Sequence, residues 1–242
     1  MIVIVCAVVC RIVVSPRYVD IVFSWFVFCK QKTAYEIEYG LVGSEMCIRD
    51  RSNGEIQKLL AEAEAAVPGT LDRVLGPLAE VWRARTALPR AQQVVWADSI
   101  STGPNNADVP PEWKAAFARL GDEPVIKRQQ MQRAYDAYFV PAAATARKLQ
   151  LNSELGVALA FDCHVQNGKS RVRAVAELTR LAGQLPEAEM RLRLANRVAD
   201  LSSPKWRQDV RGRKITIASG EATFRGRHYV LANWGLDDFP AA

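Results

Sequence analysis

The stretch "SELGVALAFDCHVQNG", residues 153–168, decides the fold of this chain. Its middle, from Leu155 to Phe161, contains only apolar residues and glycine. A helix that is apolar on every side is normally buried, so we expect this segment to form the central core helix. Asn152 or Ser153 is expected to cap its start, because either side chain can accept a hydrogen bond from a free backbone N–H of the first turn.

Helical patterns flank this segment on both sides, with apolar residues recurring three and four positions apart. Pro68-Gly69 is expected to end one helix and Gly76-Pro77 to bend or split the next, which Thr70 is a candidate to cap. Pro141 is expected to kink the longest pattern, because proline removes a backbone hydrogen bond. The predicted helices cover residues 55–67, 70–84, 89–100, 111–121, 123–149, 153–166, 170–182, 186–200 and 204–211.

The C-terminal tail departs from the helical pattern. The stretch "KITIASGEATFRGRHYVL", residues 214–231, combines β-branched and aromatic residues with Ser219-Gly220 and Gly226. This composition is typical of short strands joined by turns, so we expect a small hairpin or an irregular β element. The predicted fold class is therefore mostly α, a helical lobe with a small C-terminal β element.

The first 51 residues resemble neither a soluble domain nor a clear membrane segment. Residues 1–29 are rich in Val, Ile, Phe and Cys, but charged residues and a proline leave apolar runs shorter than the roughly 20 residues of a membrane span. Residues 30–51, which include "KQKTAYEIEYGLVGSEMCIRD", back-translate into a flow-cell primer, an interval of sample-index length and a transposase adapter. We therefore interpret residues 1–51 as a non-native segment, with adapter translation preceded by unrelated upstream frame.

This interpretation sets the domain boundaries. Residues 52–242 remain as the helical lobe, and residues 1–51 are expected to pack poorly against it. A membrane anchor stays possible only if residues 1–29 are genuine. The acidic residues of the adapter-like segment receive no functional role, since adapter DNA would encode them.

Residues 52–242 offer few ligands for a metal or a cofactor. They contain one cysteine, Cys163, and two histidines, His164 and His228. One cysteine can form neither an internal disulfide nor a zinc cage, and no phosphate-binding loop motif occurs, so we expect no metal and no cofactor. Neighbouring helical positions point apart, so Cys163 is expected to be a core residue and not the partner of His164 in a nucleophilic pair.

The charge of residues 52–242 is moderately positive, with 26 Lys and Arg against 21 Asp and Glu. A positive balance suits attraction to polyanions such as cell-wall polymers or nucleic acid, without choosing between them. The size and composition suit a domain with a core of its own.

Asp162, Gln166 and Asn167 are the candidate substrate-binding or support residues, at the end of the apolar helix. Polar groups at such a position must be hydrogen-bonded, and they could bind a sugar or orient a catalytic group. Structurally, Asp162 could instead pair with an arginine, and Asn167-Gly168 could simply end the helix. The residue types alone favour this structural interpretation. The basic run "RQDVRGRK", residues 207–214, could grip phosphate or form a solvated face.

The segment "SELGVALAFDCHVQNG" resembles the C-terminal lobe of chitosanase-like members of the lysozyme superfamily, which occur among bacterial and phage cell-wall hydrolases. Two further stretches are similar to this family, "QQVVWADSI" (residues 92–100) and "LRLANRVADLSSPKWRQDVRGRKITIASGEATFRGRHYVL" (residues 192–231). The resemblance spans roughly residues 53–236 in order. The VQNG segment and the Trp-x-x-Asp-Val-x-x-Arg-Lys segment together give it its specificity.

The resemblance implies a wall-directed glycoside hydrolase, secreted or phage-associated, that cleaves β-1,4-linked amino-sugar polymers such as peptidoglycan or chitosan. Such enzymes use two carboxylates, one to protonate the leaving oxygen and one to activate water or stabilise positive charge. In intact members both precede a helix similar to "NGEIQKLL", residues 53–60. Adapter-like sequence stands there in this chain, so we expect a truncated, inactive enzyme and assign no catalytic residue.

Two other classes of function remain open. The first alternative is a non-catalytic helical module that binds peptidoglycan or a protein partner. A basic nucleic-acid-binding domain is less favoured, because no aromatic residues interleave with the basic run as base stacking would require.

Overall fold

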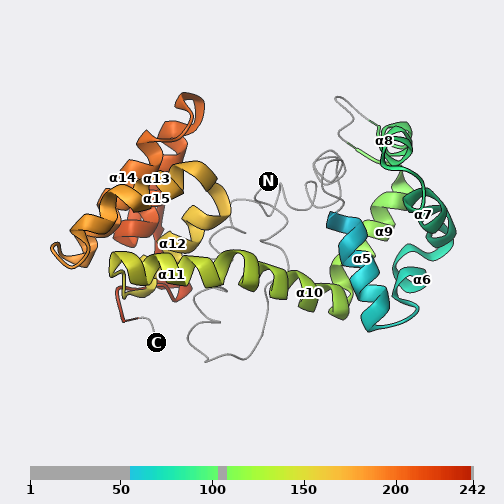
Figure 1. Ribbon diagram of the computed structural model, residues 1–242, viewed down its shortest axis with the longest axis horizontal. Coiled ribbons are helices and arrows are strands. Elements are labelled where there is room, and N and C mark those ends of the chain that lie inside the picture. The colour runs from blue at the N-terminus through green and yellow to red at the C-terminus, as the bar shows by residue number, and fades with distance from the viewer. Residues whose placement is uncertain (1–54, 103–107, 241–242) are drawn as a thin grey trace. The chain divides into compact units, whose positions relative to one another are not determined.

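The computed structural model describes residues 55–102 and 108–240, which are mostly helical with one small antiparallel sheet near the C-terminus (Figure 1). The predicted fold class is thereby confirmed. The described residues divide into two compact units, of which unit 1 ends at Gln132 and unit 2 begins at Arg133. The interpretation of residues 1–51, including their expected poor packing and the possible anchor, lies outside the described residues.

Unit 1 begins with short helices, and the predicted breaks separate them. Its elements are α5 (Glu55–Ala66), α6 (Thr70–Leu75), the 3₁₀ turn η1 (Gly76–Leu78), α7 (Ala79–Thr86), α8 (Arg90–Ser99), α9 (Pro111–Asp122) and α10 (Pro124–Ala134), whose last residues belong to unit 2. The Pro68-Gly69 break lies between α5 and α6, and Gly76-Pro77 opens η1. Both interruptions follow the sequence prediction.

The N-cap prediction for Thr70 is wrong. Thr70 is the first residue of α6, and the position before it is Gly69, whose φ is 81°. Glu64 performs the capping instead, because its Oε1 accepts from the Gly69 N–H at 2.9 Å and its Oε2 from the Leu71 N–H at 2.8 Å. These two backbone donors lower the pKa of Glu64.

Three tryptophans form the aromatic part of the core of unit 1. Trp96 lies 6.3 Å from Trp82 and 5.6 Å from Trp113 between ring centroids, in edge-to-face arrangements. Trp82 and Trp113 are buried, while Trp96 is partly buried against the same cluster. Such pairs stabilise a core beyond the burial of their area, so these rings anchor the packing of α7, α8 and α9.

Unit 2 contains the predicted core helix. Its elements are the π-helical turn η3 (Tyr135–Phe139), α11 (Val140–Leu149), α12 (Glu154–Gln166), α13 (Gly168–Leu178), the 3₁₀ turn η4 (Thr179–Leu181), α14 (Glu187–Asp200), the 3₁₀ turn η5 (Pro204–Trp206), α15 (Arg207–Ser219), β1 (Glu221–Phe224), β2 (Arg227–Val230) and the 3₁₀ turn η6 (Leu231–Trp234). Helix α12 contacts α11, α13, α14 and α15. Ser153 caps it, with its Oγ accepting from the Gly156 N–H at 3.1 Å. Residues on all sides of α12 are buried, which confirms its central position.

Next to Pro141, where a kink was expected, the structure has a π-helical turn. The Val140 N–H donates to the Tyr135 carbonyl, five residues earlier. Proline has no N–H to donate, and its ring clashes with the carbonyl four residues earlier in a regular α-helix. The wider π turn therefore accommodates Pro141 while the backbone stays helical on both sides.

The expected start of the β element is wrong by several residues. Lys214–Ser219 belongs to α15, and the hairpin begins only at Glu221. Thr216 and Ile217 are fully buried in α15, which packs against α14 and α12. The Thr216 hydroxyl also donates to the Gly212 carbonyl at 2.9 Å. Tertiary burial thus outweighs the strand preference of β-branched residues.

The hairpin itself follows the sequence prediction. Strands β1 and β2 pair antiparallel, with Phe224 opposite Arg227 next to the turn. The two turn residues, Arg225 and Gly226, have φ values of 48° and 74°. Positive φ at both positions is the geometry of the two-residue turn whose twist matches a hairpin. Phe224 and Tyr229 are buried.

The C-terminal segment is held by Arg191, whose side chain is buried. Its Nε donates to the Ala218 carbonyl at 2.8 Å, and its Nη1 donates to Ser153 Oγ at 2.6 Å. Both of its Nη atoms bond the Asp238 carboxylate. Arg191 therefore joins α14, the end of α15, the start of α12 and the C-terminal segment.

Candidate functional site

Asp162 forms the centre of a charged network inside unit 2. Its side chain is fully buried in α12 and faces α15. Oδ1 accepts from Arg213 Nη2 at 2.6 Å and from Arg213 Nε at 2.9 Å, and Oδ2 accepts from Lys214 Nζ at 2.5 Å. Burial alone would raise the pKa of Asp162, but the two cations prevail and lower it. Asp162 is therefore held as a carboxylate.

The burial of Asp162 restricts what it can do. Lys214 is also fully buried, and Arg213 is the only one of the three whose side chain reaches solvent, with 13% exposed. A polymer cannot touch Asp162 directly. Of the two roles expected from the sequence, only support of the surrounding structure is open to it.

Gln166 joins the same network through Arg213. It follows Asp162 by four positions, so the two side chains lie on one face of α12. With the side-chain amide in the orientation that satisfies its neighbours, Gln166 Oε1 accepts from Arg213 Nη1 at 2.6 Å and from Nη2 at 2.8 Å. The Asp162 network thus consists of Asp162, Gln166, Arg213 and Lys214.

Asn167 lies at the junction of α12 and α13, outside the hydrogen bonds of the Asp162 network. Its backbone N–H donates to the Cys163 carbonyl, and its own carbonyl accepts from the Arg171 N–H at 2.8 Å. Its side chain is buried, and Oδ1 finds no hydrogen-bond partner among the described residues. Gly168 begins α13 directly, so Asn167 acts as a link between two helices.

His164 has a neutral imidazole held by polar partners from two other helices. Thr145 Oγ1 of α11 lies 2.8 Å from His164 Nε2, and the Arg171 guanidinium of α13 contacts the ring nitrogens. Burial, and then the charge of Arg171, lower the pKa of His164 to about 4. A base whose pKa is lowered by burial and by a neighbouring cation is poorly suited to activate the Thr145 hydroxyl. The cluster therefore serves to join α11, α12 and α13.

Cys163 is fully buried, and burial raises the pKa of its thiol to about 11, although Lys214 opposes the shift. The reactive form of cysteine is the thiolate, so this thiol is inert in the folded protein. Its position agrees with the core role expected from the sequence.

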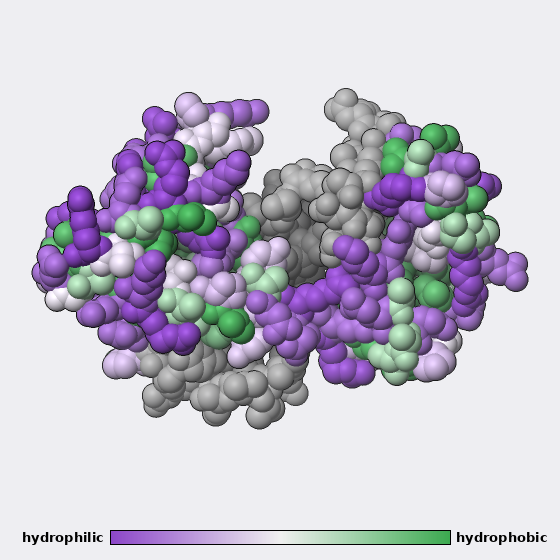
Figure 2. All heavy atoms as spheres, viewed as in Figure 1, coloured by the Kyte–Doolittle hydropathy of each residue, from purple (hydrophilic) through white to green (hydrophobic). Residues whose placement is uncertain are grey.

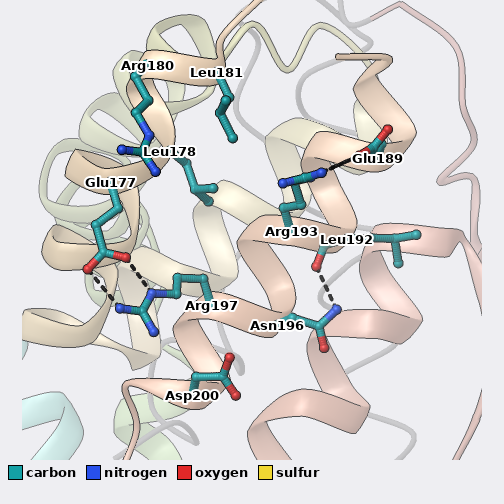
Figure 3. Close-up of a pocket in the computed structure, with 10 residues that line it drawn as sticks. All are labelled: Glu177, Leu178, Arg180, Leu181, Glu189, Leu192, Arg193, Asn196, Arg197 and Asp200. Atoms are coloured by element: carbon teal, nitrogen blue, oxygen red, sulfur yellow. Dashed lines mark hydrogen bonds and ion pairs between the residues drawn. The ribbon is translucent and has the colours of Figure 1, made fainter. Parts of the chain in front are cut away.

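An open groove lies between α13 with η4 on one side and α14 on the other (Figure 3). Its volume is about 530 Å³. Leu178 and Leu181 point into the space between the helices in Figure 3. The lining residues are Glu177, Leu178, Arg180, Leu181, Glu189, Leu192, Arg193, Asn196, Arg197 and Asp200. We call this surface the α13–α14 groove.

Ion pairs brace the walls of the α13–α14 groove. Glu177 and Arg197 form a two-point pair across the helices, with distances of 2.5 Å and 2.9 Å (Figure 3). The hydrogen bond from Arg197 is the main cause of the lowered pKa of Glu177. Along α14, Arg193 pairs with Glu189 at 2.7 Å. The groove therefore combines leucine side chains with fixed charges on its rim, which suits a ligand with both apolar and polar faces.

No group of three or more His, Cys, Asp or Glu side chains within residues 55–102 and 108–240 is arranged to hold a metal ion. No helix in these same ranges is both long and apolar enough to cross a membrane. Comparisons with protein-family models, with curated proteins and with solved structures find no match for this chain.

Sequence reasoning found two members of the Asp162 network and missed the roles of the other two. Arg213 and Lys214 were visible only as part of a basic run, whose residues could equally have faced solvent. The sequence pattern did not predict the α13–α14 groove, because its residues look like the ordinary exposed faces of two amphipathic helices. An arginine partner for Asp162 was anticipated, and Arg213 supplies it.

Proposed function

We propose that residues 52–242 are the helical lobe of a chitosanase-like glycoside hydrolase of the lysozyme superfamily, which binds β-1,4-linked amino-sugar polymer but does not cleave it in this chain. One observation carries the proposal. The two stretches with the most specific resemblance, "FDCHVQNG" and "WRQDVRGRK", lie about fifty positions apart and meet through the Asp162 network.

The contact uses the residues that define the two motifs. Asp162 and Gln166 come from the first stretch, and Arg213 and Lys214 are the Arg-Lys pair that ends the second. A buried carboxylate paired with two cations is costly unless every partner is present. Motif residues that depend on each other in this way support a shared structural origin with the family.

None of the shifted carboxyl pKa values among the described residues suits the general acid of glycoside hydrolysis. Within the described residues, the resolved shifts of carboxyl pKa values are all downward, in Glu64, Asp72, Asp108, Asp162, Glu177 and Asp238. A general acid of a glycoside hydrolase needs the opposite shift, so that it carries a proton near neutral pH. These six groups therefore act as ion-pair or capping groups, and the proposal places the catalytic carboxylates upstream of Ser52 in the intact protein.

A binding and turbidity experiment tests the proposal. The full chain would be incubated with insoluble peptidoglycan and with chitosan beads, and the bound fraction measured after sedimentation. Turbidity of a bacterial wall suspension would be followed in parallel. We expect binding to at least one polymer and no turbidity loss. Binding to neither polymer would exclude the wall-directed function, and turbidity loss would exclude the truncation.

The DNA upstream of Ser52 in an independent assembly provides a second test. The proposal requires an in-frame continuation that encodes a glutamate-bearing helix and an aspartate-rich turn. Protein that carries this continuation should clear the wall suspension, whereas its Glu→Gln variant at that helix should not. A continuation identical to residues 1–51 would instead favour a non-catalytic binding module.

A further inference from the structure

Positive charge is concentrated in unit 2. Residues 133–240 contain 17 Lys and Arg against 11 Asp and Glu, which leaves a net charge of +6. Residues 52–132 contain 9 Lys and Arg against 10 Asp and Glu, which leaves −1. The positive balance of the helical lobe therefore comes from unit 2.

The carboxylates of unit 2 are engaged within the fold. Eight of them accept from Arg, Lys or His side chains in ion pairs, namely Asp162, Glu177, Glu187, Glu189, Asp200, Asp209, Glu221 and Asp238. Glu154 and Asp237 accept from backbone N–H groups of the C-terminal segment. The negative charges of unit 2 are thus largely committed to its own structure.

Many of its cations are not committed in this way. Nine basic side chains of the described part of unit 2 form no salt bridge, namely Arg147, Lys148, Lys169, Arg171, Arg173, Arg180, Lys205, Arg207 and Arg227, although Arg171 contacts His164. In Figure 2, hydrophilic residues dominate the visible surface of unit 2, and hydrophobic residues lie between them in small groups. The net charge of residues 133–240 is positive.

Three of these cations lie along one side of α13 and η4. Lys169, Arg173 and Arg180 are exposed and are spaced by four and seven positions. At 3.6 residues per turn these spacings keep the side chains on one face, over a length of roughly 16 Å. We call this row the α13 basic stripe. Arg180 also lines the α13–α14 groove, so the basic stripe borders a hollow that contains leucine side chains.

The groove arginines differ in their availability to a ligand. Arg193 and Arg197 are already paired with carboxylates, whereas Arg180, of the three in the described lining, forms no salt bridge. Arg180 is attracted to the nearby Glu177 carboxylate without bonding it, so an incoming carboxylate at Arg180 would displace no salt bridge. The apolar face of a sugar ring could lie on Leu181 beside it, since Leu178 is buried.

We propose that the α13 basic stripe and the adjoining α13–α14 groove bind an anionic amino-sugar polymer, a wall glycan that carries carboxylates, in preference to chitosan. The inference rests on the proposed function, and it narrows the bound polymer from peptidoglycan or chitosan to an anionic glycan. Chitosan carries ammonium groups, which a row of three exposed cations repels, whereas the carboxylates of peptidoglycan are attracted by it; Glu177 offsets part of this charge near Arg173 and Arg180. Neither α13 nor the groove lining contains an aromatic side chain for base stacking, so single-stranded nucleic acid fits this surface less well.

The test compares two triple variants of the full chain with equal loss of charge. The stripe variant is Lys169→Gln, Arg173→Gln and Arg180→Gln. The control variant is Arg85→Gln, Lys205→Gln and Arg227→Gln, which removes three exposed cations that also form no salt bridge. Circular dichroism spectra and melting curves would establish that both variants fold. Binding to purified peptidoglycan freed of teichoic acid, to chitosan and to duplex DNA would be measured at 50 and 300 mM salt.

We expect the stripe variant to lose about tenfold or more of its affinity for peptidoglycan, and the control variant to lose less than about threefold. The wild-type affinity should fall with salt, because exposed charge contacts are screened. Equal losses of affinity in the two variants would show that binding is not localised at the α13 basic stripe. Tighter binding of the wild type to chitosan than to peptidoglycan would contradict the preference for an anionic polymer. Either result would leave the proposed function standing. Binding to DNA alone, with none to either glycan, would overturn the inference and the proposed function together.

Discussion

Asp162 and Lys214 form an ion pair in which neither side chain reaches solvent, with Oδ2 and Nζ 2.5 Å apart. Taking both charges out of water is costly, and their mutual attraction offsets that cost only while both remain. Arg213 and Gln166 extend the pair to the protein surface. The link between α12 and α15 therefore depends on all the charged and hydrogen-bonding partners being present, and not on any single residue.

Replacing Lys214 by Met should lower the free energy of unfolding by about 3 kcal/mol, because it leaves a buried carboxylate with one partner fewer. Urea unfolding followed by circular dichroism would measure the loss. The double variant Asp162→Asn with Lys214→Met should lose less than the single Lys214→Met variant, since no fully buried charge is then left and Arg213 still reaches solvent. A single variant within about 0.5 kcal/mol of wild type would show that the pair is not needed.

Acid should destabilise the protein partly through His164. In the unfolded chain this imidazole takes up a proton near its ordinary pKa of 6.5, whereas in the folded chain it does so only near about 4. The unfolded state therefore binds more protons between these values, so stability falls as the pH falls through this window. Melting temperatures between pH 7.5 and 4.5 should fall less steeply for His164→Gln than for wild type. His228→Gln, at an exposed position of the hairpin, serves as the control, and identical slopes for His164→Gln and wild type would contradict this assignment.

Replacing Arg191 by Met should loosen the C-terminal segment and cost about 2 to 3 kcal/mol, since several buried hydrogen bonds lose their donor. Hydrogen exchange of the Leu236 amide, which donates to the Leu231 carbonyl, would report the loosening. Arg193→Met provides a matched control two positions away on α14. Its pair with Glu189 is exposed, so it should cost less than about 0.5 kcal/mol. Equal effects of the two changes would contradict the special role of Arg191.

Two glycine substitutions should have opposite effects. A Cβ at Gly156 in α12 would lie 2.6 Å from Glu187 Oε1 and 2.8 Å from Leu151 Cβ, so Gly156→Ala should destabilise by about 1 to 3 kcal/mol. A Cβ at Gly121 in α9 meets nothing within 4 Å, so Gly121→Ala should stabilise by up to about 1 kcal/mol. Thermal melts of both variants would decide the matter, and a stabilising Gly156→Ala would refute the close packing at this site.

The sequence predicted those structural features that a single segment determines by its own residues. The apolar run of α12 required burial whatever surrounded it, and the positions of Pro68-Gly69 and Gly76-Pro77 ended helices through their own backbone chemistry. The prediction for Thr70 was wrong because Gly69 takes the N-cap position, and Glu64, six positions before Thr70, accepts from the N–H groups of Gly69 and Leu71. The capping preference of one residue can therefore be outweighed by a side chain that lies outside the local sequence pattern.

Longer-range features could not be predicted in the same way. Ile215 to Ile217 have a strand-like composition, but contacts of α15 with α12 and α14 keep them helical. The partners of Asp162 lie 51 and 52 positions away, so only the packing of α12 on α15 selects Arg213 and Lys214 from the basic run. The α13–α14 groove likewise depends on how two helices pack, which neither helix specifies alone.

The division of the described residues at Gln132 and Arg133 has a consequence for cooperativity. Two compact units with separate cores can unfold in two steps. The chain then has two unfolding midpoints in place of one. Scanning calorimetry should resolve whether the heat of unfolding is absorbed in one peak or two. If there are two, Lys214→Met and Arg191→Met should shift one peak, and Gly121→Ala should shift the other.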